Sequence, residues 1–185
     1  HPEGDAMDEQ ARYLEIDVAG ITMAGLYLPN GNPVFDDDGA FSGKFTYKLD
    51  WMKRLAARAE ALNATGRPVL FGGDFNIIPS DADAWDINVW KGDALHRPES
   101  LAAFREICWK GYTELFRAHH PGTIAYSFWD YQGGAWQKDH GIRIDHFLAN
   151  AEATDLVREV GIDKTPRGND RASGHTPVWC ILARP

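Results

Sequence analysis

The pair Asp74 and Asn76 is the part of the sequence best suited to chemistry. It follows the apolar residues 69–71 and the glycines Gly72 and Gly73. A buried strand that ends in glycines lets the backbone turn tightly and leaves an Asp and an Asn, two residues apart, projecting on the same side. A carboxylate beside an amide can orient a water molecule, a hard cation such as Mg²⁺ or a phosphate oxygen. The alternative is that both side chains only cap the turn.

Asp145 and His175 can form a second acid–base pair. Asp145 lies in the apolar segment 142–149, where strand alternation places it on the same face as Arg143. A carboxylate buried there needs a partner. That partner is either Arg143, in an ion pair, or His175, whose tautomer and charge the carboxylate would then control. His175 precedes the apolar run 176–182, a position that also suits an ordinary hydrogen-bonding loop residue.

Aromatic and cationic side chains are candidates for substrate contact. Tyr27 ends the β-rich run 21–28, where its phenol could reach a ligand oxygen. Phe128 and Trp129 lie in a glycine-flanked loop, where they could stack on a base or a sugar or could cover the core. Two clusters of cations are present, for which the alternative is a solvated surface. They comprise Lys44, Lys48, Lys53 and Arg54, and Lys164, Arg167 and Arg171.

The composition limits where such a site can be. The chain has 185 residues, 44% of them hydrophobic, which suits one domain over residues 1–185. It has no apolar run of 18 residues and opens on polar residues, so we expect neither a membrane span nor a signal peptide. The net charge of −8 restricts any nucleic-acid contact to a local surface. Cys108 and Cys180 lack metal-site spacing, which favours reduced thiols and a cytoplasmic location.

The elements that position these residues alternate between helices and short strands, as in a layered α/β fold. The expected elements are a hairpin (13–18 and 21–28), an amphipathic helix (44–63), a buried strand (69–71), a loop with a short helix (81–90), a second helix (98–110) and four short strands (112–116, 142–149, 153–159 and 176–182).

Five segments in order resemble the exonuclease III branch of the endonuclease/exonuclease/phosphatase superfamily, the Mg²⁺-dependent apurinic/apyrimidinic (AP) endonucleases. The segments are 27–31 (YLPNG), 73–79 (GDFNIIP), 127–131 (SFWDY), 143–148 (RIDHFL) and 173–178 (SGHTPV). The resemblance covers essentially the whole chain. It implies a four-layer α/β/β/α sandwich with the site at one edge of the two packed sheets. It also implies hydrolysis of a DNA phosphodiester 5′ to an abasic site, or removal of nucleotides from a 3′ end.

The resemblance further implies roles for single residues. Asp74 would orient or deprotonate the attacking water, and Asn76 would hold the water or the phosphate. His175, supported by Asp145, would neutralise a phosphate oxygen, while Tyr27 would contact the phosphate.

Four more residues would bind the substrate. Phe128 and Trp129 would press against the abasic sugar, and Lys44 and Arg143 would be the substrate-binding cations.

Two departures from the family pattern bear on the metal. Asp74 and Asn76 would ligate Mg²⁺ or Mn²⁺, but the segment with the family's principal Glu ligand does not precede Tyr27, so we expect an N-terminally incomplete domain. Gly174 stands where the family has an Asp. We therefore expect weak Mg²⁺ binding, little nuclease activity, and pairing with a second copy through an exposed sheet edge.

Two other functions stay open. One is a phosphatase that acts on inositol phosphates or a phospholipid headgroup, although the loop at Phe128 and the segment 141–148 favour the DNA branch. The other is a catalytically silent module that binds DNA ends or a protein partner, which Gly174 and the missing Glu favour.

Overall fold

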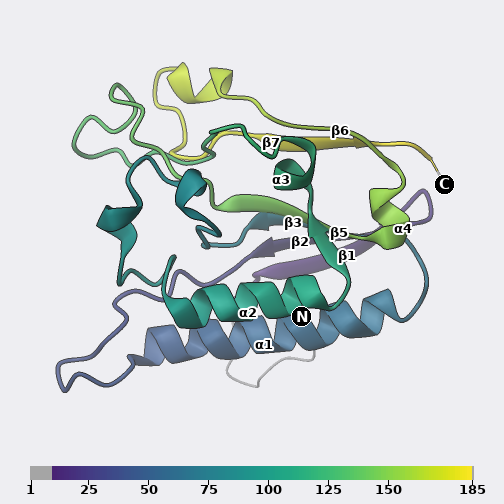
Figure 1. Ribbon diagram of the computed structural model, residues 1–185, viewed down its shortest axis with the longest axis horizontal. Helices are drawn as coiled ribbons and strands as arrows, with labels where there is room; N and C mark the ends of the chain where they lie inside the picture. Colours follow the sequence, from purple (N-terminus) through teal and green to yellow (C-terminus); the bar gives the residue numbers. More distant parts are fainter. Residues whose placement is uncertain (1–9, 185) are drawn as a thin grey trace.

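The structure, a computed structural model, describes residues 10–184 and is built in layers (Figure 1). Helices α1 (Gly43–Asn63) and α2 (Pro98–Trp109) lie against one face of a five-stranded sheet. A two-stranded sheet, β6 (Val157–Ile162) and β7 (Val178–Leu182), lies over the other face. The expected α/β sandwich is thus confirmed, with one helical layer and two sheets in the described part of the chain.

The five-stranded sheet brings the ends of three strands together. Its order is β1-β2-β3-β5-β4. The strands are β1 (Tyr13–Val18), β2 (Ile21–Tyr27), β3 (Val69–Asp74), β4 (Tyr112–Glu114) and β5 (Asp145–Asn150). Strands β2 and β3 are parallel, and β5 runs antiparallel to β3. The last residues of β2 and β3 therefore lie beside the first residue of β5, at one edge of the sheet.

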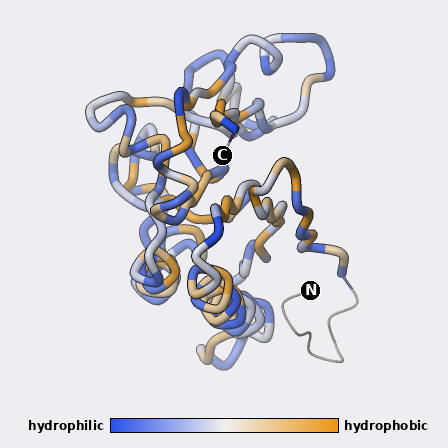
Figure 2. The backbone as a smooth tube through the Cα atoms, turned by 90° about the vertical axis from the view of Figure 1, so that its right-hand side faces the viewer, coloured by the Kyte–Doolittle hydropathy of each residue, from blue (hydrophilic) through white to orange (hydrophobic). Residues whose placement is uncertain are grey.

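Apolar side chains fill both spaces between the layers. Leu55 and Ala59 of α1 pack with Phe71 of β3, and all three side chains are fully buried. On the opposite face, Leu70 of β3 packs with Val160 of β6 and with α3 (Leu115–His119). Figure 2 shows hydrophilic positions on the outer side of the helical layer. No helix within residues 10–184 has both the length and the apolar character that a membrane crossing requires.

The expected hairpin and both long helices are confirmed, but several strand boundaries differ from the expectation. The expected strand 142–149 begins only at Asp145. Instead of a strand 153–159, the chain forms a short helix, α4 (Ala151–Thr154), before β6 begins at Val157. The cause is Asn150, whose Oδ1 accepts a hydrogen bond from the Ala153 N–H (3.1 Å) and caps this helix.

The region after α2 also departs from the expectation. The expected strand 112–116 ends at Glu114, whose carboxylate accepts a hydrogen bond from the Arg117 N–H (2.8 Å) and so starts α3. The segment 81–90 contains two short 3₁₀ turns, at Asp81–Asp83 and Ile87–Trp90, in place of one short helix.

Candidate active site

Tyr27, Asp74 and Asp145 lie side by side on three neighbouring strands. The sheet register pairs Tyr27 of β2 with Asp74 of β3, and Asp74 with Asp145 of β5. The Tyr27 side chain is about half exposed, whereas the carboxylates of Asp74 and Asp145 are only 13% and 12% exposed. Two poorly solvated carboxylates on adjacent strands repel each other unless a positive group lies between them.

His175 provides that positive group. Its Nδ1 lies 3.0 Å from Oδ2 of Asp145, and its Nε2 lies 3.9 Å from Oδ2 of Asp74. The Ser127 hydroxyl donates to the same Asp145 oxygen at 2.6 Å and thereby fixes the carboxylate. The prediction that His175 is the partner of Asp145 is confirmed, and the alternative pairing of Asp145 with Arg143 is wrong.

The surroundings shift the pKa values of two of these groups. Burial, followed by the charge of Asp145, raises the pKa of Asp74 to about 6. Burial alone would lower the pKa of His175, but its hydrogen bond to Asp145 and the charges of Asp145 and Asp74 outweigh this effect, so that the pKa rises above its usual value. The site thus holds a carboxylate that can accept a proton near neutral pH, next to an imidazole whose protonated form the two carboxylates favour.

Asn76 anchors Asp74. Its backbone has φ = 47°, in the left-handed region, and the residue is 5% exposed. The Asn76 N–H donates to Oδ1 of Asp74 (2.8 Å), and its side-chain amide donates to Oδ2 of Asp74 (3.2 Å) and to the Leu28 carbonyl (2.9 Å). Its Oδ1 accepts from the Asn30 side chain (3.1 Å). In this arrangement Asn76 orients the Asp74 carboxylate, and its own polar atoms are already engaged.

Lys48 also belongs to the site, although we expected a surface cation. It is 0% exposed, and its Nζ donates to the carbonyls of Asn76 (2.7 Å) and Asn30 (3.0 Å). Burial lowers the pKa of Lys48 to about 7, partly offset by Asp93 and Asp74. The available signal was its spacing three residues after Phe45, which places it on the apolar face of the helix.

Arg143 is a buried structural cation, which corrects the expectation that it binds substrate. Its side chain is 1% exposed; Nε donates to Asp83 (2.8 Å) and Nη1 to Glu114 (2.7 Å). Strand alternation failed as a guide here because β5 starts only at Asp145, so that Arg143 is not part of the strand.

Phe128 and Trp129 are adjacent in the chain, but only Phe128 lies beside the candidate site. Trp129 is 1% exposed and donates its indole N–H to Asp139 (3.0 Å), which corrects the expectation that it meets the sugar. The Phe128 ring, by contrast, lies against the His175 ring with centroids 4.8 Å apart. A Cβ at Gly174 would come within 2.8 Å of this ring, so the glycine lets Phe128 pack there.

Lys44 is exposed in the first turn of α1. Its contact with a substrate stays a prediction.

The described residues do not make a complete Mg²⁺ site. Within residues 10–184, no three His, Cys, Asp or Glu side chains are arranged to hold a metal ion. Ser127 and His175 occupy the oxygens of Asp145, and Asn30 occupies the amide oxygen of Asn76. Both oxygens of Asp74 accept hydrogen bonds from Asn76, and its carboxylate is the one in the cluster that no hydroxyl or imidazole of the described residues contacts within 3.5 Å.

Known proteins of one family resemble this chain in sequence. The profile of the Endonuclease/Exonuclease/phosphatase family matches residues 11–177. Exodeoxyribonuclease III of Haemophilus influenzae is 28% identical over 173 residues, which cover 90% of this chain and 63% of that protein. A DNA-(apurinic or apyrimidinic site) endonuclease of Dictyostelium discoideum is 25% identical over 177 residues, 95% of this chain and 46% of that protein. The chain thus spans between about half and two thirds of the length of these curated relatives.

Solved structures agree with the match in sequence. A 3′-5′ exonuclease from Neisseria meningitidis superposes with a TM-score of 0.88 at 30% identity, over 95% of this chain and 66% of that chain. An AP endonuclease from Archaeoglobus fulgidus superposes with a TM-score of 0.86 at 26% identity, over 96% of this chain and 67% of that chain.

The buried position of Arg143 generates a prediction about stability. Arg143→Met removes the fully buried partner of two poorly solvated carboxylates, Asp83 and Glu114, whose other cationic neighbours are Arg117 and His146, and should lower the free energy of unfolding by about 3–5 kcal/mol. Urea denaturation followed by circular dichroism measures the loss. Arg158→Met, at an exposed position of β6, is the control and should change stability by less than about 0.5 kcal/mol. A loss below about 1 kcal/mol for Arg143→Met would contradict the structural role.

Proposed function

The chain belongs to the Endonuclease/Exonuclease/phosphatase family, and on this premise we propose that it is a DNA-repair phosphodiesterase that acts on abasic sites or 3′ ends. The observation that carries the proposal is the cluster of Asp74, Asp145 and His175 at one sheet edge. The names of the relatives support DNA as the substrate, and a solved 3′ phosphatase from Neisseria, 29% identical with a TM-score of 0.88, is bound to a product DNA hairpin.

In the proposed reaction, a water oxygen forms a bond to phosphorus while the bond to the 3′ oxygen breaks. Asp74, with a pKa of about 6, is ionised at neutral pH and accepts the proton of the water. The leaving 3′ oxygen takes a proton from solvent. His175, whose charged form Asp145 favours, would neutralise a phosphate oxygen, and the phenol of Tyr27 would contact the same phosphate.

Substrate contacts in this proposal come from the residues that remain accessible. Phe128, packed beside His175, would lie against the abasic sugar. Lys44, exposed at the start of α1, would contact the DNA backbone. The net charge of the chain is −8, so most of its surface would repel DNA. DNA would therefore bind only at this edge of the sheet, through a small number of such cations.

We also propose that Mg²⁺, or Mn²⁺ in its place, binds weakly, chiefly through Asp74. When bound, the ion would neutralise charge on the phosphate. The amide oxygen of Asn76 would have to leave Asn30 before it could contribute, and Gly174 offers no side-chain oxygen. Weak metal binding would in turn keep the activity of this chain low.

We further propose a cytoplasmic location, which the sequence favours and with which the unpaired Cys108 and Cys180 are compatible.

The proposal is tested by nicking of a supercoiled plasmid that carries abasic sites. We expect slow nicking that requires millimolar Mg²⁺ and that falls at least about 100-fold in Asp74→Asn and in His175→Ala, because each removes a proton acceptor or a positive charge from the reacting phosphate. The matched controls are Asp155→Asn and His119→Ala, both exposed; they should leave the rate unchanged.

Three outcomes of this assay would contradict the proposal. Equal rates in the parent and Asp74→Asn would exclude the proposed base. Tight binding of abasic DNA without nicking by the parent would identify a catalytically silent module. Release of phosphate from a soluble inositol phosphate, with no preference for DNA, would identify a phosphatase.

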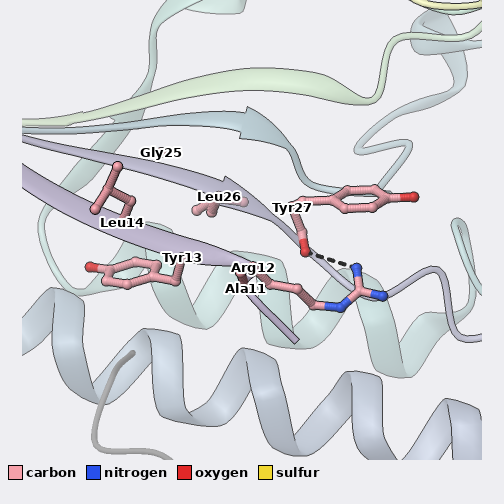
Figure 3. Close-up of a pocket in the computed structure, with 7 residues that line it drawn as sticks. All are labelled: Ala11, Arg12, Tyr13, Leu14, Gly25, Leu26 and Tyr27. Atoms are coloured by element: carbon pink, nitrogen blue, oxygen red, sulfur yellow. Dashed lines mark hydrogen bonds between the residues drawn. The ribbon is translucent and has the colours of Figure 1, made fainter. Parts of the chain in front are cut away.

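Among residues 10–184, β1 is an edge strand of the five-stranded sheet, and this supports a second proposal, that two copies of the chain associate. Leu14, Ile16 and Val18 project from one face of this edge strand and are 66%, 49% and 46% exposed. Beside them lies a hollow of about 450 Å³ (Figure 3). It is lined by Ala11, Arg12, Tyr13, Leu14, Gly25, Leu26 and Tyr27. An unpaired strand with an apolar face can pair with the same strand of a second copy.

Sedimentation velocity at micromolar concentration tests this association. We expect the parent to sediment as a dimer and Ile16→Lys as a monomer, because the charge would be buried at the interface. Ile181→Lys is the matched control, since Ile181 is 50% exposed on β7, and should remain dimeric. A monomeric parent at this concentration would refute the association.

A further inference from the structure

A buried lysine joins the two loops that carry the site. Lys48 of α1 is 0% exposed and donates through Nζ to the Asn30 carbonyl, in the loop after β2, and to the Asn76 carbonyl, in the loop after β3. An ammonium group has several donors and no acceptor, so it can hold two carbonyls at once. The two loops follow Tyr27 and Asp74, the strand-end residues of the site.

The contacts at Asn76 explain why such a clamp is needed. Asn adopts the left-handed region more readily than most non-glycine residues, and the contacts around Asn76 hold it at φ = 47°. Lys48 holds the Asn76 carbonyl at 2.7 Å, and the His146 ring holds the next carbonyl, that of Ile77, at 3.0 Å. Both donors are buried, so neither carbonyl would find water if its donor were removed.

The loop after β2 is shaped around the lysine. Gly31 has φ = +89°, and a Cβ at this position would lie 2.6 Å from Cδ of Lys48. The glycine therefore lets the backbone close over the aliphatic stem. Asp93 and Asp74 favour the charged form of the buried amine and offset part of the cost of its burial.

We propose that Lys48 is a positioning residue: by holding the carbonyls of Asn30 and Asn76, it keeps the Asn76 side chain where it orients the Asp74 carboxylate. The consequence for catalysis rests on the proposed phosphodiesterase function. The consequence for Asn76 does not, because it concerns the folded chain alone.

The test compares Lys48→Met, Lys48→Arg and Lys53→Met. Methionine keeps an unbranched apolar stem, one atom shorter, and loses the donors; arginine restores donors and charge; and Lys53 is an exposed control on the same helix. Two readouts are taken: hydrogen exchange of the Asn76 side-chain amide by NMR in the absence of DNA, and kcat and KM for nicking of abasic plasmid.

We expect Lys48→Met to speed exchange of the Asn76 amide about tenfold to a hundredfold and to lower kcat by a similar factor, with KM changed less than about threefold. Lys48→Arg should recover most of both losses, and Lys53→Met should match the parent. If Lys48→Met does not fold, Lys48→Gln, which retains one donor group, replaces it with the same expected direction.

Parent-like exchange of Asn76 in folded Lys48→Met would overturn the proposal, as would an equal loss in Lys53→Met. If the parent does not nick DNA at all, the proposed function fails, and the exchange measurement still decides the role of Lys48.

Discussion

The repulsion between two poorly solvated carboxylates, Asp74 and Asp145, is the constraint on which the site depends. The sheet register sets them on adjacent strands, where burial and the charge of Asp145 raise the pKa of Asp74. His175 relieves this conflict by lying within 3.0 Å of one and 3.9 Å of the other. In the proposed reaction, Asp74 of this cluster serves as the base and His175 as the group that neutralises the phosphate.

A second requirement is that these groups do not move. Asn76 satisfies both oxygens of Asp74, and Ser127 and His175 engage Asp145. Such saturation preorganises the cluster but leaves few free oxygens for a hard cation. Rigidity of the carboxylates and the weak metal binding that we propose would both follow from this one hydrogen-bond network.

Sequence reasoning found the residues whose chemistry is visible at strand ends. Asp74, Asp145 and His175 each stand next to an apolar run, so strand register could bring them together. The prediction failed for Arg143 and Trp129 because their burial depends on Asp83 and Asp139, polar partners that no local pattern identifies. Lys48 was missed since a lysine on the apolar face of a helix is explained only by carbonyls contributed by two other loops.

The most direct measurement is an NMR pH titration of the His175 ring in the parent and in Asp145→Asn. Because Asp145 and Asp74 favour the imidazolium, the parent should show a pKa above 6.5, so that the ring keeps its proton to higher pH than a free histidine. In Asp145→Asn the pKa should fall. A parent value at or below 6.5 that does not change in Asp145→Asn would contradict the account, since the carboxylates and the imidazole would then not act as one charged cluster.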